Sequence, residues 1–225
     1  MLLVSNKSSN GFLEFLNENN FDYILTKNNP NLDSRIADHP DLSLSIIDDN
    51  TIVIDESLKE YYIEKITNRN IIWGESARNP YPYDAIYNIY KGSNFYIHNS
   101  YTETNIEKFM MDHDIRHYST KQGYTRCSII PMGDKILTSD LGIYKSLRNK
   151  IEVILLKEDY IPLDGFDYGF IGGTCGLVHD TLIFNGNIRT LDSYEIIKDE
   201  ASRSGIKLLY PDDLPLRDLG SIFHL

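Results

Sequence analysis

The chain has 225 residues, of which 41% are hydrophobic and 24% are charged, as in an ordinary folded domain. Its 33 acidic residues outnumber the 22 basic ones, and the net charge of −11 argues against nucleic acid or an anionic membrane as a partner. Two cysteines are too few for a disulfide framework. The N-terminus has neither the basic flank nor the apolar run of a leader, so we expect a cytoplasmic protein.

A unit of strand, tight turn, strand, helix and strand is predicted to recur along the chain. Asp, Asn and Gly lie between the apolar runs, where a turn needs a positive φ or a side-chain hydrogen bond to the backbone. The strands on either side are short and rich in β-branched and aromatic residues. In chain order, the predicted hairpins pair 42–47 with 52–54, 85–90 with 95–97, 127–130 with 136–138, and 175–178 with 182–184.

A helix is predicted after each hairpin, because apolar residues there recur at three and four positions. Two polar stretches, 27–40 and 158–173, interrupt the pattern and are predicted to be loops over one rim. The predicted helices cover 11–19, 56–66, 102–110, 141–147 and 193–204, and each is followed by a short strand.

The two ends of the chain supply the two halves of a fifth unit, a first strand at 221–225 and a second strand at 2–4. A repeat of roughly 44 residues with complementary ends predicts a closed ring, because closure removes two exposed sheet edges. We therefore predict one α/β domain over 1–225, a five-fold pseudosymmetric propeller closed by pairing of the N- and C-terminal strands. Its units are expected at about 1–27 plus 218–225, 41–75, 84–118, 126–157 and 174–210.

This ring resembles the pentein fold, the α/β propeller of arginine deiminases, agmatine deiminases, amidinotransferases and dimethylarginine hydrolases. A ribosome anti-association initiation factor, which is not an enzyme, has the same fold. Besides the five units, Phe170-Ile171-Gly172-Gly173 and the ending Leu219 to His224 carry this resemblance. From about Tyr118 onward, the segments 121–128, 165–173 and 220–222 are also similar to an uncharacterised bacterial family of clostridial type.

The resemblance does not supply a catalytic nucleophile. Guanidine-modifying penteins place a reactive Cys in the last repeat, after a run like Gly-Gly-x-Ile-His. Here the run reads Gly220-Ser221-Ile222-Phe223-His224-Leu225 and contains no thiol. The chain is therefore expected either to modify a small guanidino or amino compound, as a hydrolase or transferase, or to act as a non-catalytic module that binds a ligand or a protein.

Residues that precede the first strands, among them Asp41, Asp84, Arg126 and Asp218, are expected to converge on the axis of a five-fold ring. Residues that end the second strands, among them Asp140, are expected to form another ring. Carboxylates at one mouth would suit a guanidinium or ammonium group, which binds carboxylates in fork geometry. The alternative is that they cap separate strands and helices, as Asp140 would just before a helix. The predicted substrate-binding residues are Asp41, Asp84, Arg126, Asp140 and Asp218.

Cys127 and His39 are the predicted reactive residues. Cys127 follows Arg126, and a nearby cation lowers the pKa of a thiol, although a free Cys is also one of the most commonly buried residues. His39-Pro40-Asp41 brings imidazole and carboxylate together for acid–base work, or forms a rigid loop that enters a strand. We expect a small cationic ligand, no cofactor, no metal and no membrane partner, and leave a homo-oligomer open.

Overall fold

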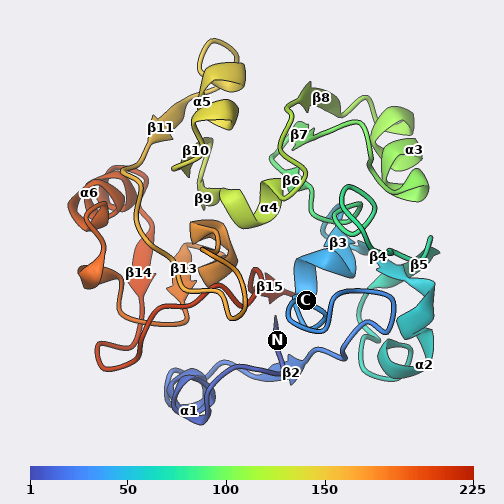
Figure 1. Cartoon of the computed structure of the whole chain (residues 1–225), viewed down its shortest axis with the longest axis horizontal. Coiled ribbons are helices and arrows are strands. Elements are labelled where there is room, and N and C mark those ends of the chain that lie inside the picture. The colour runs from blue at the N-terminus through green and yellow to red at the C-terminus, as the bar shows by residue number, and fades with distance from the viewer.

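A computed structural model describes all 225 residues and contains five three-stranded sheets arranged around a central axis (Figure 1). In each sheet the first and second strands pair antiparallel, and the third runs parallel to the second. The sheets are β3–β4–β5 (Leu44–Ile46, Thr51–Asp55, Asn70–Gly74), β6–β7–β8 (Tyr90–Lys91, Phe95–His98, Arg116–Ser119), β9–β10–β11 (Ile130–Met132, Lys135–Thr138, Val153–Leu155), β12–β13–β14 (Cys175–Val178, Thr181–Phe184, Lys207–Leu209) and β15–β1–β2 (Phe223–His224, Leu2–Val4, Tyr23–Leu25).

One helix of each unit lies on the outside of the ring (Figure 1). Side chains cap several of these helices, as the Asp140 carboxylate does by accepting from the Ile143 N–H. Gly205 follows α6 at a φ of 66°, a left-handed conformation that favours glycine after a helix. The outer helices are α1 (Asn10–Glu18), α2 (Lys59–Tyr62, after the 3-10 turn Glu56–Leu58), α3 (Thr104–Asp112), α5 (Leu141–Leu147) and α6 (Tyr194–Arg203).

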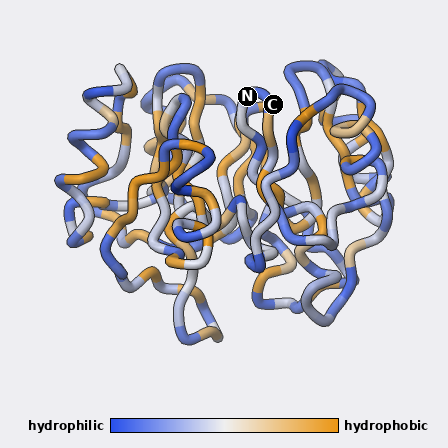
Figure 2. The backbone as a smooth tube through the Cα atoms, turned by 90° about the horizontal axis from the view of Figure 1, so that it is seen from above, coloured by the Kyte–Doolittle hydropathy of each residue, from blue (hydrophilic) through white to orange (hydrophobic).

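The two ends of the chain complete the fifth sheet, as the sequence predicts. Leu2 pairs with His224 and Leu3 with Phe223 in antiparallel register. The Leu225 N–H donates to the Met1 carbonyl at 2.9 Å. Figures 1 and 2 both show the two ends side by side. The seam is apolar, since Leu2, Leu3 and Val4 are completely buried.

Two predicted first strands are instead helical or turn segments near the axis. Residues 125–128 form the short helix α4 (Thr125–Ser128), and β9 starts only at Ile130. In the second unit, residues 85–89 form turns and only Tyr90–Lys91 is a strand. Both segments are buried near the axis, and each is too short for its residue period to distinguish a strand from a helical turn.

Hydrophobic segments run through the strands, while the loops are largely hydrophilic (Figure 2). The buried core lies mainly between each sheet and its outer helix and between neighbouring units. No helix has the length and apolar character needed to span a bilayer.

Candidate functional site

A cavity of about 280 Å³ opens at the mouth of the ring where the chain enters the first strands. Its walls carry four aromatic rings, those of Tyr124, Phe166, Tyr168 and Phe170. Polar lining is contributed by His39, Cys127, Asp167 and Asp218. We call this space the aromatic cavity. Its residues come from both predicted rim loops and from the segments that precede three first strands, so it depends on convergence of the units at the axis.

His39, Cys127 and Asp218 form a compact buried group beside the aromatic cavity. Their ligating atoms all lie within 4.8 Å of one another, and His39 Nδ1 is 3.8 Å from Asp218 Oδ1. Asp41 lies next to them, with Oδ2 at 3.0 Å from Cys127 Sγ and at 2.7 Å from the Ser221 N–H that it accepts. The other oxygen of Asp41 is buried without a hydrogen-bond partner. The structure therefore brings four of the predicted site residues together.

Backbone donors hold the Asp218 carboxylate in place. The N–H of Phe170 donates to Oδ2 at 2.7 Å, and the N–H of Gly220 donates to Oδ1 at 3.0 Å. A Cβ on Gly173 would lie 2.0 Å from Asp218 Oδ1, so glycine is needed there for the carboxylate to fit. The second glycine of the Gly172-Gly173 pair thus makes room for the buried Asp218 carboxylate.

The Cys127 thiol is held by two side chains, those of Asn88 and Asp41, rather than activated. The Asn88 amide donates to Sγ at 3.1 Å, and Sγ–H donates to Asp41. Burial, together with the negative charges of Asp41 and Asp218, raises the pKa of Cys127 well above its usual value. Cys127 is only 2% exposed, so at neutral pH it is a protonated, hydrogen-bonded thiol.

Arg126 lies away from the mouth at which the sequence predicted it. Its side chain lines a different cavity, at the opposite end of the first strands. Adjacent residues of a helical turn point about 100° apart, so α4 directs Cys127 and Arg126 to different mouths. The expected lowering of the Cys127 pKa by this cation is therefore wrong.

The other two predicted carboxylates lie outside the aromatic cavity. Asp84 accepts a hydrogen bond from the Tyr124 hydroxyl at 2.8 Å, behind the cavity wall, and burial raises its pKa. Asp140 caps α5 by accepting from the Ile143 N–H at 2.8 Å, and it also accepts from Gln122 at 3.0 Å. Asp140 thus makes the contacts of a helix cap, the alternative role for these carboxylates. Of the four, only Asp218 lines the aromatic cavity, and Asp41 is buried behind it in contact with Cys127.

The aromatic walls and Asn88 were missed from the sequence. Asn88 also accepts from the backbone N–H groups of Arg126 and Cys127, at 2.8 and 3.1 Å, and so fixes the start of α4. Aromatic residues alternate with others in Gly165-Phe166-Asp167-Tyr168-Gly169-Phe170. This pattern could have indicated a binding surface, because three large aromatic side chains are unusual in a polar loop that forms none.

Two kinds of positively charged ligand suit this group of residues. His39, Cys127 and Asp218 offer one nitrogen, one sulfur and one oxygen, the atom types that bind zinc in proteins. An organic cation would instead use the carboxylate together with the aromatic faces. The raised pKa of Asp218, caused mainly by burial, means that a cation would bind by stabilising its ionised form.

Five sheets of this topology around an axis, with a polar group at one mouth, define a pentein-fold protein. A dimethylarginine dimethylaminohydrolase from Pseudomonas aeruginosa, in complex with citrulline, superposes with a TM-score of 0.54 at 12% identity, covering 94% of this chain and 91% of that one. The agmatine deiminase of C. jejuni gives a TM-score of 0.51 at 10% identity, covering 93% and 75% of the two chains. Likeness at these identities establishes the fold.

The chain belongs to a family of unknown function (DUF6873), whose model matches residues 3–223. The comparison with curated proteins gave no match.

Proposed function

We propose that the chain binds a small organic cation, a guanidino or amino compound, in the aromatic cavity. The observation that carries this proposal is a pair of buried carboxylates, Asp218 in the wall of the cavity and Asp41 behind it, in contact with Cys127. Neither forms an ion pair with a lysine or arginine, and the His39 imidazole, near Asp218, is the only basic side chain within 4 Å. Buried negative charge without a counterion is costly, and a cation in the cavity would offset that cost.

The aromatic walls support the same kind of ligand. Faces of Tyr and Phe rings attract cations electrostatically when the cation lies within about 6 Å of the ring centre. Phe166 already has the guanidinium of Arg35 at 4.1 Å from its ring centroid, on the rim of the cavity. The volume, about 280 Å³, suits a small metabolite. The pentein-fold proteins compared above are named for dimethylarginine and agmatine, which are both guanidino compounds.

Binding is favoured over covalent catalysis by the state of the Cys127 thiol. A nucleophilic Cys needs a thiolate, whereas burial and two carboxylates raise the pKa of Cys127. Hydrolase or transferase chemistry is therefore the second candidate, supported by the closeness of His39 to the thiol. A non-catalytic module that binds a protein at this mouth is the remaining alternative.

Thermal shift and titration calorimetry with agmatine and arginine test the binding proposal. Citrulline is the analogue of arginine in which an uncharged ureido group replaces the guanidinium, and EDTA is present to remove metal ions. We expect the cations to raise Tm and citrulline to leave it unchanged, because a ligand specific for the folded state stabilises it. The variant Asp218→Asn should weaken binding by about tenfold or more, the value of one charged hydrogen bond.

The matched control is Asp199→Asn, which removes the same charge from the exposed face of α6. It should bind like the wild type. If neither agmatine nor arginine raises Tm, or if D218N binds them as tightly as the wild type does, the cation proposal is wrong. Catalysis would instead be established if the wild type released ammonia or urea from agmatine or arginine and the Cys127→Ser variant bound these compounds without releasing either product.

A further inference from the structure

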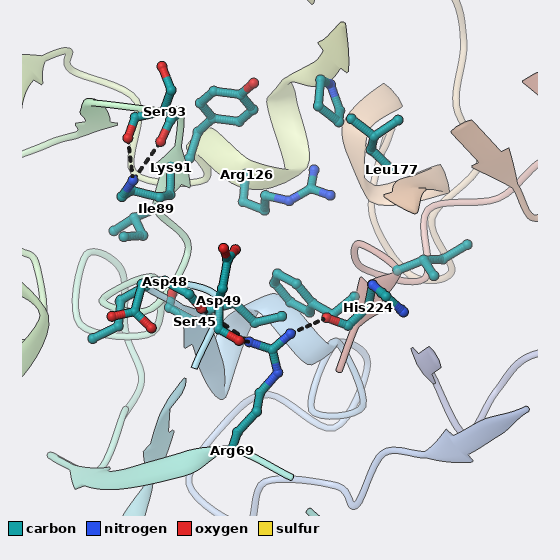
Figure 3. A pocket seen from close by; sticks show the side chains of 17 residues that line it. Ser45, Asp48, Asp49, Arg69, Ile89, Lys91, Ser93, Arg126, Leu177 and His224 are labelled. Atoms are coloured by element: carbon teal, nitrogen blue, oxygen red, sulfur yellow. Dashed lines mark hydrogen bonds between the residues drawn. The ribbon is translucent and has the colours of Figure 1, made fainter. Parts of the chain in front are cut away.

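A second cavity lies on the ring axis at the opposite mouth, where the first strands reach their hairpins. Its volume is about 560 Å³, twice that of the aromatic cavity. All five first strands contribute to it, through Ser45, Tyr90, Pro131, Leu177 and Phe223, among others. We call it the hairpin cavity (Figure 3). Because every unit supplies part of its wall, this space is a product of the whole ring.

Three cationic side chains line the hairpin cavity: Arg69, Lys91 and Arg126. None of them forms an ion pair with any acidic side chain of the protein. The acidic residues that line it, Asp48 and Asp49, are exposed at the hairpin tip, where water screens them. In a chain of net charge −11, three unpaired cations in one cavity call for an explanation.

Arg126 is the most informative of the three. Arg126 is only 8% exposed, yet its guanidinium makes a single hydrogen bond to the protein, from Nη1 to the Ile129 carbonyl at 3.3 Å. Figure 3 shows the guanidinium extended across the cavity, between Ile89 and Leu177. The ring of Phe223 lies 5.6 Å from it, a cation–π contact that leaves most of its five N–H donors without an acceptor.

Burial of a charge with so few partners is costly unless something else satisfies it. A structural role would provide a carboxylate or several carbonyl acceptors, as Arg35 has in Asp33 and in the Gly165 carbonyl. Arg126 has neither, and its free donors face open space. A planar, doubly accepting anion such as a carboxylate or phosphate matches the guanidinium fork.

Backbone carbonyls hold the other two cations in position. Arg69 donates to the carbonyls of Asp48, Asp49 and His224, at 3.1, 2.8 and 3.3 Å. Lys91 Nζ donates to the carbonyls of Gly92 and Ser93, at 2.6 and 3.1 Å. These bonds fix where the positive charges lie without neutralising them, and Figure 3 shows both side chains at the wall. Burial lowers the pKa of Lys91, an effect that a bound anion would oppose.

We propose that the hairpin cavity is a binding site for a small anionic metabolite, one whose carboxylate or phosphate group contacts Arg126. The apolar lining from Ile89, Leu177 and Ile222 would contact the uncharged part of that metabolite. This site is separate from the aromatic cavity in position and in charge, so it stands whether or not the aromatic cavity binds a cation.

Titration of the full chain with inorganic phosphate and with succinate tests this site, at low ionic strength and against sodium chloride of equal ionic strength. We expect both anions to raise Tm beyond the chloride control. Arg126→Gln should weaken the binding of phosphate or succinate by about tenfold or more, as expected for a lost charge-assisted hydrogen bond. Lys91→Gln lies at the wall and should weaken it less.

Lys145→Gln is the matched control, because it removes one positive charge from the exposed face of α5 and should bind like the wild type. Asp218→Asn should also leave anion binding unchanged. If R126Q proves unstable, K91Q against K145Q still decides the question. No Tm rise beyond that of chloride, or equal anion affinity in K91Q, K145Q and the wild type, would overturn the proposal.

Discussion

His98 illustrates how a single buried side chain links the stability of this fold to pH. It ends β7 and is completely buried. Its Nε2–H points at the carbonyls of Ala85 and Gly123, at 3.1 and 2.8 Å, and its Nδ1 accepts from the Thr102 hydroxyl at 2.9 Å. Burial lowers the pKa of His98 from 6.5 to about 4, so the native state holds the neutral ring.

This histidine predicts a loss of stability in mild acid. Between pH 6.5 and 4 the unfolded chain binds the proton and the native chain does not, so the free energy of unfolding falls as the pH falls. The loss amounts to about 2 kcal/mol by pH 5. Urea unfolding of the wild type and of His98→Gln at pH 7 and pH 5 measures it. The Gln amide keeps a donor and an acceptor but does not titrate, so the variants should differ by this amount.

His113→Gln is the control, because His113 is exposed after α3 and should keep the wild-type pH profile when replaced. A stability difference between wild type and H98Q that is the same at both pH values would show that His98 does not exclude the proton. Other titratable groups change the absolute stability between these pH values, but they do so equally in the wild type and in both variants.

For individual residues, the sequence predicted which side chains meet at the axis better than it predicted where each side chain points. His39 and Asp218 were predicted just before first strands and Cys127 at the start of one, which was enough to expect them near one axis, and the structure brings their ligating atoms within 4.8 Å of one another. The side-chain direction of Arg126 required knowledge that residues 125–128 form a helical turn rather than a strand. In a strand, neighbours point to opposite faces of one sheet, whereas here they reach opposite mouths of the ring.

At the scale of elements, the pairing of β15 with β1 carries the closure of the ring. Ile222 and Leu225 are each 4% exposed, and the Ser221 N–H holds Asp41 at 2.7 Å. Full burial of one such apolar side chain stabilises a fold by roughly 1.5–3 kcal/mol, so these residues contribute a large fraction of the 5–15 kcal/mol typical of a domain.

Deletion of residues 220–225 is therefore expected to prevent stable folding. It would leave β1 with an unpaired edge and expose the apolar surfaces beneath β15. Circular dichroism should show no cooperative thermal transition. Phe223→Tyr is the control, since it keeps the backbone pairing and a half-buried ring, and its Tm should stay close to that of the wild type. An unchanged Tm after the deletion would mean that the terminal strand is dispensable.

The elements themselves were predictable where turn chemistry marked them. Asp48-Asp49-Asn50 and Met132-Gly133-Asp134-Lys135 each join a hairpin at the predicted place, and Gly133 has the positive φ that such a turn requires. The failures, at 85–89 and 125–128, are short segments whose hydrogen bonds depend on the neighbouring unit. Asn88, for example, binds the backbone of Arg126 and Cys127, a contact that no local pattern reveals.

At the scale of the whole molecule, the two mouths of the ring differ in the sign of their buried charge. Asp41 and Asp218 lie at the mouth where the chain enters the first strands, and Arg126 faces the other. The separation follows from strand direction, since all five first strands run the same way along the axis. A ring of this kind offers two chemically different sites on one axis, which a single sheet with one exposed face does not.

Because the ring is closed, the chain ends could lie in another unit without changing the fold, and a circular permutant tests this. The Leu225 N–H already bonds to the Met1 carbonyl, so a short glycine linker can join the ends without moving either strand. A permuted chain opened between Gly133 and Asp134, in the β9–β10 turn, should fold with the same far-UV spectrum and a similar Tm. Nothing lies within 4 Å of a Cβ placed on Gly133, so new ends there meet open space.

The informative control keeps the same linker but opens the chain between Leu182 and Ile183, inside β13. Both residues are completely buried and pair with strands on either side, so that permutant should fail to give a cooperative transition. If the permutant opened after Gly133 fails to fold even with longer linkers, the pairing of β1 with β15 depends on free chain ends. Success of both permutants would mean that the second strand of a unit tolerates a break, contrary to the packing that places it at the centre of its sheet.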